Sequence, residues 1–62
     1  MTINTVTYSD EELLMVLHHL RNYQRLAVEK QLTSHTAREI DYWRHELSVT
    51  ISAIAATEEA LG

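Results

Sequence analysis

The four histidines are the residues whose chemistry would be most versatile, because imidazole binds metals and transfers protons near neutral pH. His18 and His19 are adjacent, so in a helix they point about 100° apart and cannot hold one ion together. Asp41 and His45 have the four-residue spacing that places two ligands on one helix face. A structural zinc site needs four ligands, and the chain has no cysteine. We therefore predict no metal site and no cofactor, and interpret Asp41 and His45 as a surface pair.

Nucleophilic catalysis would need a serine, a histidine and an acid that converge in a pocket. All three residue types occur, but the only glycine is Gly62, so the glycine-rich turns that hold a nucleophile or a phosphate are missing. Nothing in the spacing of the paired acids Glu11–Glu12 and Glu58–Glu59 predicts a raised pKa. We therefore predict that the chain is not an enzyme and has no catalytic residues.

Aromatic and arginine side chains offer a second kind of chemistry, because aromatic rings stack on bases and arginine binds phosphate bidentately. Tyr23, Tyr42 and Trp43 occur in the same basic stretch as four arginines. A site for a small anion such as a nucleotide, held between two copies of the chain, would use Arg21, Arg25, Arg38, Tyr42 and Arg44. The alternative is that the aromatic residues belong to a helix–helix core, as aromatics at helical spacing usually do.

Two helix starts are predicted by capping boxes, in which Ser or Thr is followed three residues later by Glu. Ser9 with Glu12 predicts the first start, and Thr36 with Glu39 predicts the second. The acidic residues Asp10 and Glu11 favour the first, because negative charge is stabilising near a helix N-terminus. We predict an all-α antiparallel hairpin over 9–62, with helices at about 9–33 and 36–61 joined by a loop at about 33–36. One continuous helix is the alternative.

Apolar residues recur at helical spacing in both segments. In the first, Leu13, Val16, Leu17, Leu20, Tyr23, Ala27 and Val28 share one arc. In the second, Ile40, Trp43, Leu47, Thr50, Ile54, Thr57 and Leu61 form a heptad seam that Ile51 widens.

The second segment also has a second apolar strip, which we place nearly opposite its seam: Tyr42, Val49, Ala53, Ala56 and Ala60. A helix with two apolar faces needs two neighbours, and one hairpin supplies only one. A chain of 62 residues is also marginally stable alone. We therefore predict self-association, most simply into a four-helix bundle. The predicted core and oligomer interface comprise Leu13, Leu17, Leu20, Tyr23, Ala27, Ile40, Trp43, Leu47, Val49, Ile51, Ala53, Ile54 and Ala56.

Charge is distributed unevenly along the chain. Residues 18–45 contain all five basic residues and three acids, a net charge of +2, whereas the remainder carries −6. A hairpin would therefore have a basic loop end and an acidic open end, a layout that favours head-to-tail pairing of neighbouring copies. The acidic end (Asp10, Glu11, Glu12, Glu58 and Glu59) is a candidate docking site for a basic partner.

Size and composition narrow the class of protein further. The net charge of −4 argues against nucleic-acid binding, which needs a basic footprint. The longest apolar run, 13–17, is far shorter than a membrane span. We expect a cytoplasmic protein, with an extended N-terminal arm at 1–8. Our leading hypothesis is a small regulator or inhibitor that binds a larger protein and occludes its surface; the oligomeric binder of an anionic ligand is the alternative.

Overall fold

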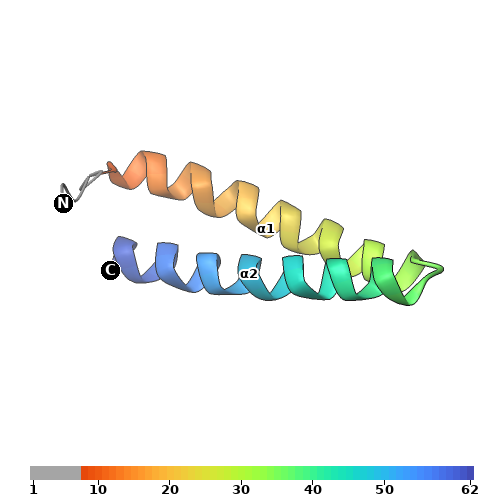
Figure 1. The fold of residues 1–62 in the computed structure, drawn as a ribbon. Coiled ribbons are helices and arrows are strands. Elements are labelled where there is room, and N and C mark those ends of the chain that lie inside the picture. The colour runs from red at the N-terminus through yellow and green to blue at the C-terminus, as the bar shows by residue number, and fades with distance from the viewer. Residues whose placement is uncertain (1–7) are drawn as a thin grey trace, which may run out of the picture.

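Two α-helices joined by a short loop make up the part of the chain that the structure, a computed structural model, describes (8–62). Helix α1 spans Asp10–Thr33 and helix α2 spans Ala37–Leu61. They pack against each other in opposite directions, so the start of α1 and the end of α2 lie at the same end of the molecule (Figure 1). The predicted all-α hairpin is confirmed, and the alternative of one continuous helix is wrong. The predicted N-terminal arm at 1–8 lies outside the described residues except for Tyr8.

Both helix starts that the sequence predicts are observed, and the first has its complete capping box. Ser9 Oγ accepts a hydrogen bond from the Glu12 backbone N–H at 3.2 Å, and the Glu12 carboxylate accepts one from the Ser9 backbone N–H at 3.1 Å. The Ser9 hydroxyl also donates to this carboxylate, at 2.9 Å. The backbone bond from Ser9, and then this hydroxyl bond, lower the pKa of Glu12 below its usual value. Between Thr36 and Glu39, only the first half of this exchange is formed within the described part of the chain: Thr36 Oγ1 accepts from the Glu39 N–H at 3.1 Å.

The loop between the helices follows from local competition for backbone hydrogen bonds. The Thr33 hydroxyl donates to the Glu29 carbonyl at 3.0 Å, and the Ser34 hydroxyl donates to the Lys30 carbonyl. Hydroxyl side chains that bond the last carbonyls of a helix replace the N–H groups that would continue it. Ser34 accordingly leaves the helical conformation, with φ −71° and ψ 144°.

The interface between the helices follows a heptad pattern, with alternating steps of three and four residues. All of its positions are buried or partly buried. They are Leu13, Leu17, Leu20, Gln24, Ala27 and Gln31 of α1 with Ile40, Trp43, Leu47, Thr50, Ile54, Thr57 and Leu61 of α2. The seam predicted for α2 is the observed one, whereas the arc predicted for α1 is partly wrong. Val16 and Val28 are 39% and 42% exposed, and two glutamines occupy seam positions instead.

Little apolar surface is fully enclosed by this interface. Among residues 8–62, the buried apolar residues are Leu17 and Ala27, and the buried polar ones are Thr50 and Thr57. The two threonine hydroxyls donate to the carbonyls of Glu46 and Ala53, four residues earlier, at 2.6 and 2.7 Å, so their burial leaves no unpaired donor. No side chain larger than these reaches full burial in the described chain. The hairpin core is therefore thin and partly polar.

No helix within residues 8–62 is both long enough and apolar enough to cross a bilayer.

Candidate interaction surfaces

One flank of the hairpin, which we call the tyrosine face, carries Val16 and Tyr23 of α1 with Tyr42, Glu46, Val49, Ala53, Ala56 and Ala60 of α2. The α2 members follow one another at steps of four and three, so they form a continuous strip along the helix. The Tyr23 hydroxyl donates to the Glu46 carboxylate at 2.8 Å, which places the α1 and α2 members on the same side of the molecule. This strip is a flank of α2 beside the seam, and not opposite the seam as predicted.

Three aromatic rings are packed together at the loop half of the tyrosine face. The Tyr23 and Trp43 ring centroids are 6.3 Å apart, and Tyr42 meets Trp43 edge-on at 5.0 Å and 86°. Both separations lie in the range that aromatic pairs prefer. The cluster is only partly enclosed, because Tyr42 remains 55% exposed. Trp43 thus lies in the seam and also packs against Tyr42, which is exposed on the tyrosine face.

The Tyr23–Glu46 hydrogen bond is the best-shielded polar contact between the helices, since it is partly buried. Acceptance by the Glu46 carboxylate holds the proton on the phenol and raises the pKa of Tyr23 above its usual value of 10.0, with desolvation adding to the effect. The contact therefore stays intact across the whole neutral range. It fixes the orientation of Tyr23 at the edge of the aromatic cluster.

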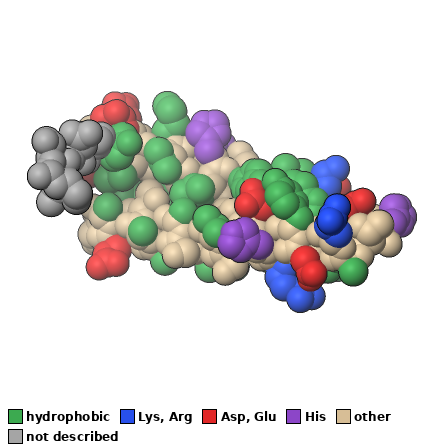
Figure 2. All heavy atoms as spheres, viewed as in Figure 1, with side chains coloured by type: hydrophobic (Ala, Val, Ile, Leu, Met, Phe, Trp, Pro, Cys, Tyr) green, Lys and Arg blue, Asp and Glu red, His purple; other side chains and the backbone are tan. Residues whose placement is uncertain are grey.

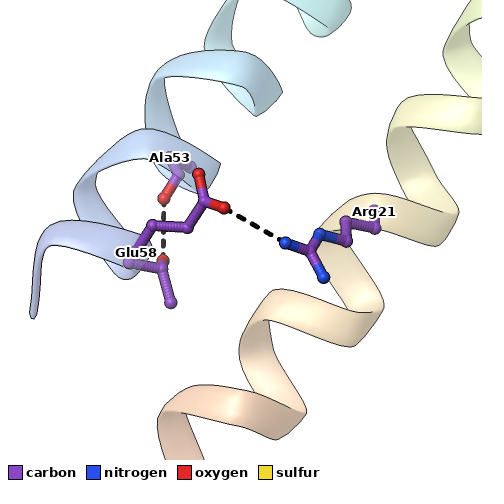
Figure 3. Close-up of polar contacts among 4 residues, drawn as sticks. Arg21, Ala53 and Glu58 are labelled. Carbon is purple, nitrogen blue, oxygen red and sulfur yellow. Dashed lines mark hydrogen bonds and ion pairs between the residues drawn. The ribbon is translucent and has the colours of Figure 1, made fainter. Parts of the chain in front are cut away.

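The opposite flank, which we call the arginine face, carries Leu14, Arg21, Arg25, Val28 and Leu32 of α1 with Arg44, Ile51 and Glu58 of α2. Its contact between the helices is an ion pair: Arg21 Nη2 lies 3.1 Å from Glu58 Oε2 (Figure 3). The two side chains are 57% and 52% exposed, so water screens the attraction. Figure 3 shows this pair beside the Ala53 carbonyl that accepts the Thr57 hydroxyl.

A shallow hollow of about 570 Å³ lies along α1 on the arginine face. It is lined by Arg21, Gln24, Arg25, Val28, Glu29 and Leu32. The floor is mainly apolar, and Leu32 at its rim is 81% exposed. All of these residues come from one helix, so the hollow is an open groove along that helix.

The residues predicted to bind an anion do not converge in the hairpin. Tyr23 lies two residues from both Arg21 and Arg25, which turns it about 200° away from them on the helix. The aromatic rings accordingly lie on the tyrosine face, whereas Arg21 and Arg25 line the hollow on the other side. Arg44 lies on the arginine face with its Nη1 atom 3.8 Å from the Asp41 carboxylate. Arg38, near the start of α2, is exposed.

The predicted acidic docking end is brought together by the fold, because residues 10–12 and 58–59 lie at the same end of the hairpin (Figure 1). Figure 2 shows acidic side chains on both helices at this end, while basic side chains appear only toward the loop on the face drawn. Two of the five acids are already engaged: Glu12 in the first cap and Glu58 with Arg21. The negative end available to a partner therefore consists mainly of Asp10, Glu11 and Glu59, all exposed.

The histidines form no metal centre in the described chain. His18 and His19 have ring centroids 5.8 Å apart at an interplanar angle of 65°, and His18 Nε2 pairs with the Asn22 side-chain amide at 3.3 Å. Nowhere in residues 8–62 do three or more His, Cys, Asp or Glu side chains lie where they could share an ion.

The predicted core and interface residues divide into two sets. Leu13, Leu20, Ile40, Trp43, Leu47 and Ile54 line the helix–helix seam with Leu17 and Ala27, whereas Tyr23, Val49, Ala53 and Ala56 lie on the tyrosine face. Ile51 is 49% exposed and lies on the arginine face beside the seam. Glu46 was not predicted as a site residue. Its place in the 4–3 series between Tyr42 and Val49 is the signal that would have assigned it to the strip.

Known proteins offer no comparison for these surfaces. No family model matches the chain, and neither the curated proteins nor the solved structures contain a match to it.

Proposed function

We propose that this chain is a non-enzymatic protein-interaction module, which self-associates and acts as a small regulator or inhibitor by covering a surface of a larger protein. The observation that carries the proposal is the exposure of its apolar side chains. Among residues 8–62, ten large apolar side chains are at least 39% exposed, whereas only Leu17 and Ala27 are buried apolar residues. Seven of the ten lie on the two faces, whereas Tyr8, Met15 and Leu26 lie on neither. Apolar side chains that gather on one surface mark interaction sites, whereas single scattered ones do not.

The mechanism would be occlusion of the partner's surface. A hairpin of two helices presents a long, narrow surface, and an amphipathic helix typically binds by laying its apolar side chains into a groove of the partner. The arginine face fits this role, because Val28, Leu32 and Ile51 are exposed beside charged side chains that would form a polar rim. The acidic end would add electrostatic steering toward a basic partner.

Affinity capture with matched variants tests the interaction. The immobilised wild-type chain, Leu32→Gln and the triple variant Asp10→Asn, Glu11→Gln, Glu59→Gln would be compared in an extract of the source organism. We expect the wild type to retain a protein in stoichiometric amount, and at least one variant with unchanged helix content to lose it. The purified partner should lose activity when the chain binds. Equal retention by all three forms would contradict docking through these surfaces.

Binding of a small anion is the alternative function, and the hollow with Arg21 and Arg25 is the observation in its favour. It is weaker in two respects, because Arg21 already pairs with Glu58 and the aromatic rings lie on the other flank. A thermal-shift panel of phosphorylated compounds tests it, since a ligand at 100 times its Kd adds about 2.7 kcal/mol of stability. The absence of any shift across the panel would exclude this function.

A further inference from the structure

We propose that the tyrosine face is the surface on which a second copy of this chain packs about a two-fold axis, with α2 of one copy antiparallel to α2 of the other. This inference rests on the self-association in the proposed function and specifies its surface and direction. Four observations support it: the exposure of the face, its spacing, its gradient of side-chain size and the distribution of charge.

The exposure and spacing of the tyrosine face suit another helix. Tyr42 and Val49 are 55% and 52% exposed, and Val16 on α1 is 39% exposed. The α2 strip continues at steps of four and three from Tyr42 to Ala60, the period with which one helix packs along another. The seam of the hairpin uses the same period on the adjacent side of α2. Helix α2 thus has two contiguous heptad strips, of which α1 covers one.

The gradient of side-chain size sets the direction of packing. The strip is bulky at the loop half, where Tyr42 lies against Trp43, and small at the open half, where Ala53, Ala56 and Ala60 follow. Tyr42 and Ala56 are each seven residues from Val49. A two-fold axis at Val49 therefore places Tyr42 over Ala56 of the partner subunit, large against small, as interdigitated packing requires. Parallel packing would instead place tyrosine against tyrosine and alanine against alanine.

The charges favour the same direction. Arg38 and Glu59 lie eleven and ten residues on either side of Val49, so the antiparallel arrangement brings Arg38 near Glu59 of the partner subunit. More generally, it sets the +2 loop half of each copy beside the −6 remainder of the other. Parallel packing would bring the two acidic ends together, and like charges in juxtaposition disfavour a complex.

The arginine face is less suited to a second copy. Its heptad strips are interrupted by Arg21, Arg44 and Glu58, and the Arg21–Glu58 ion pair spans the two helices there. A second copy on this face would have to desolvate all three charged groups, whereas the strip of the tyrosine face contains one, Glu46, which already accepts the Tyr23 hydroxyl. Self-association through the tyrosine face leaves the arginine face and its hollow free for a larger protein.

A matched pair of substitutions tests the surface. Val49 and Ile51 are 52% and 49% exposed, lie two residues apart in the same helix and face opposite flanks. We expect sedimentation equilibrium to show that the wild type is a dimer, that Val49→Glu weakens it about 100-fold or more by placing two carboxylates at the axis, and that Ile51→Glu leaves it unchanged. Helix content from circular dichroism would accompany each measurement.

The outcomes separate this inference from the proposed function. A dimer that is lost with Ile51→Glu but kept with Val49→Glu would overturn the tyrosine face as the interface and leave self-association standing. Equal loss in both variants would also overturn it. A monomeric wild type would overturn both the inference and the self-association, while capture of a larger partner would still be measured independently.

A size exchange tests the direction and does not depend on how Val49→Glu folds. Tyr42→Ala and Ala56→Tyr should each weaken the dimer about tenfold, because one leaves a gap and the other brings two tyrosines together. The double variant Tyr42→Ala, Ala56→Tyr should recover most of the wild-type affinity, because large again meets small. If the loss of dimer affinity in the double variant, expressed as a free energy, equals the sum of the two single losses, the antiparallel register is wrong.

Discussion

At the middle of α2 the two flanks of the hairpin are about equally exposed, but different contacts join the helices on each flank. Val49 on the tyrosine face and Ile51 on the arginine face differ by only three percentage points in exposure. The contact between the helices on the tyrosine face is a partly buried hydrogen bond, Tyr23 to Glu46, beside the tilted pair of rings formed by Tyr23 and Trp43. On the arginine face it is an ion pair between two side chains that are more than half exposed.

Because of this difference, the two faces are suited to different kinds of contact. Partly shielded hydrogen bonds and aromatic contacts hold one geometry, whereas an exposed ion pair is screened by water and contributes little. The tyrosine face is therefore a preformed surface, and preformed surfaces bind at a lower entropic cost. The arginine face has long, exposed side chains around an open hollow, so under the proposed function it would suit a partner other than a second copy.

The largest effect is expected from removing Trp43, whose ring packs against both tyrosines of the tyrosine face. Trp43→Ala should lower the free energy of unfolding by about 3 kcal/mol, the low end of the range for a large aromatic residue because Trp43 is only partly buried. Both tyrosine contacts would be lost with it. Urea unfolding followed by circular dichroism measures the effect.

Leu32→Ala is the control for that experiment, because Leu32 is 81% exposed on the arginine face. It should leave the unfolding midpoint unchanged. Equal destabilisation by the two substitutions would mean that the aromatic cluster has no special part in the fold.

A smaller effect is expected from the hydroxyl of Tyr23. Tyr23→Phe removes the hydrogen bond to Glu46 while keeping the ring against Trp43, so the loss of stability should be well below that of Trp43→Ala. The folded state raises the pKa of Tyr23, so the contribution of this bond is complete below pH 10 and is lost as the pH rises through the raised value. The wild type should therefore lose its advantage over Tyr23→Phe in strongly alkaline buffer. A constant difference between the two melting temperatures from pH 8 to 11 would contradict this role of the proton.

The sequence predicted the hairpin because its signals are local. Each capping box involves a Ser or Thr and a Glu three residues later, and such contacts form in almost any context. The α2 seam was also predicted, since large apolar residues such as Trp43, Leu47 and Ile54 recur along it at heptad spacing. These parts of the fold can be predicted without knowing how the two helices pack.

The α1 seam and the two flanks were harder to predict because they depend on how the helices meet. Gln24 and Gln31 occupy seam positions although they are polar, while Val16 and Val28 lie outside although they are apolar. Hydrophobicity alone therefore placed the two valines in the arc and left the two glutamines out of it. The two-residue spacing of Tyr23 from Arg21 and Arg25 already predicts that they face different flanks of α1. The Tyr23–Glu46 and Arg21–Glu58 contacts are needed to show which flank of α1 meets which flank of α2.

The smallest expected effect belongs to the ion pair of the arginine face. Arg21→Gln removes the contact with Glu58 and should lower the free energy of unfolding by only about 0.3 kcal/mol, as is typical of exposed pairs. The effect should decrease further in 1 M salt, where the Debye length is only about 3 Å. The Tyr23→Phe effect should persist in the same buffer, because a neutral donor in a partly buried contact is less sensitive to ionic strength. Melting curves of both variants at low and high salt give the comparison. If Arg21→Gln proved the more damaging substitution, and remained so in salt, the arginine face would be the better-ordered flank, and the assignment of the preformed surface to the tyrosine face would have to be reversed.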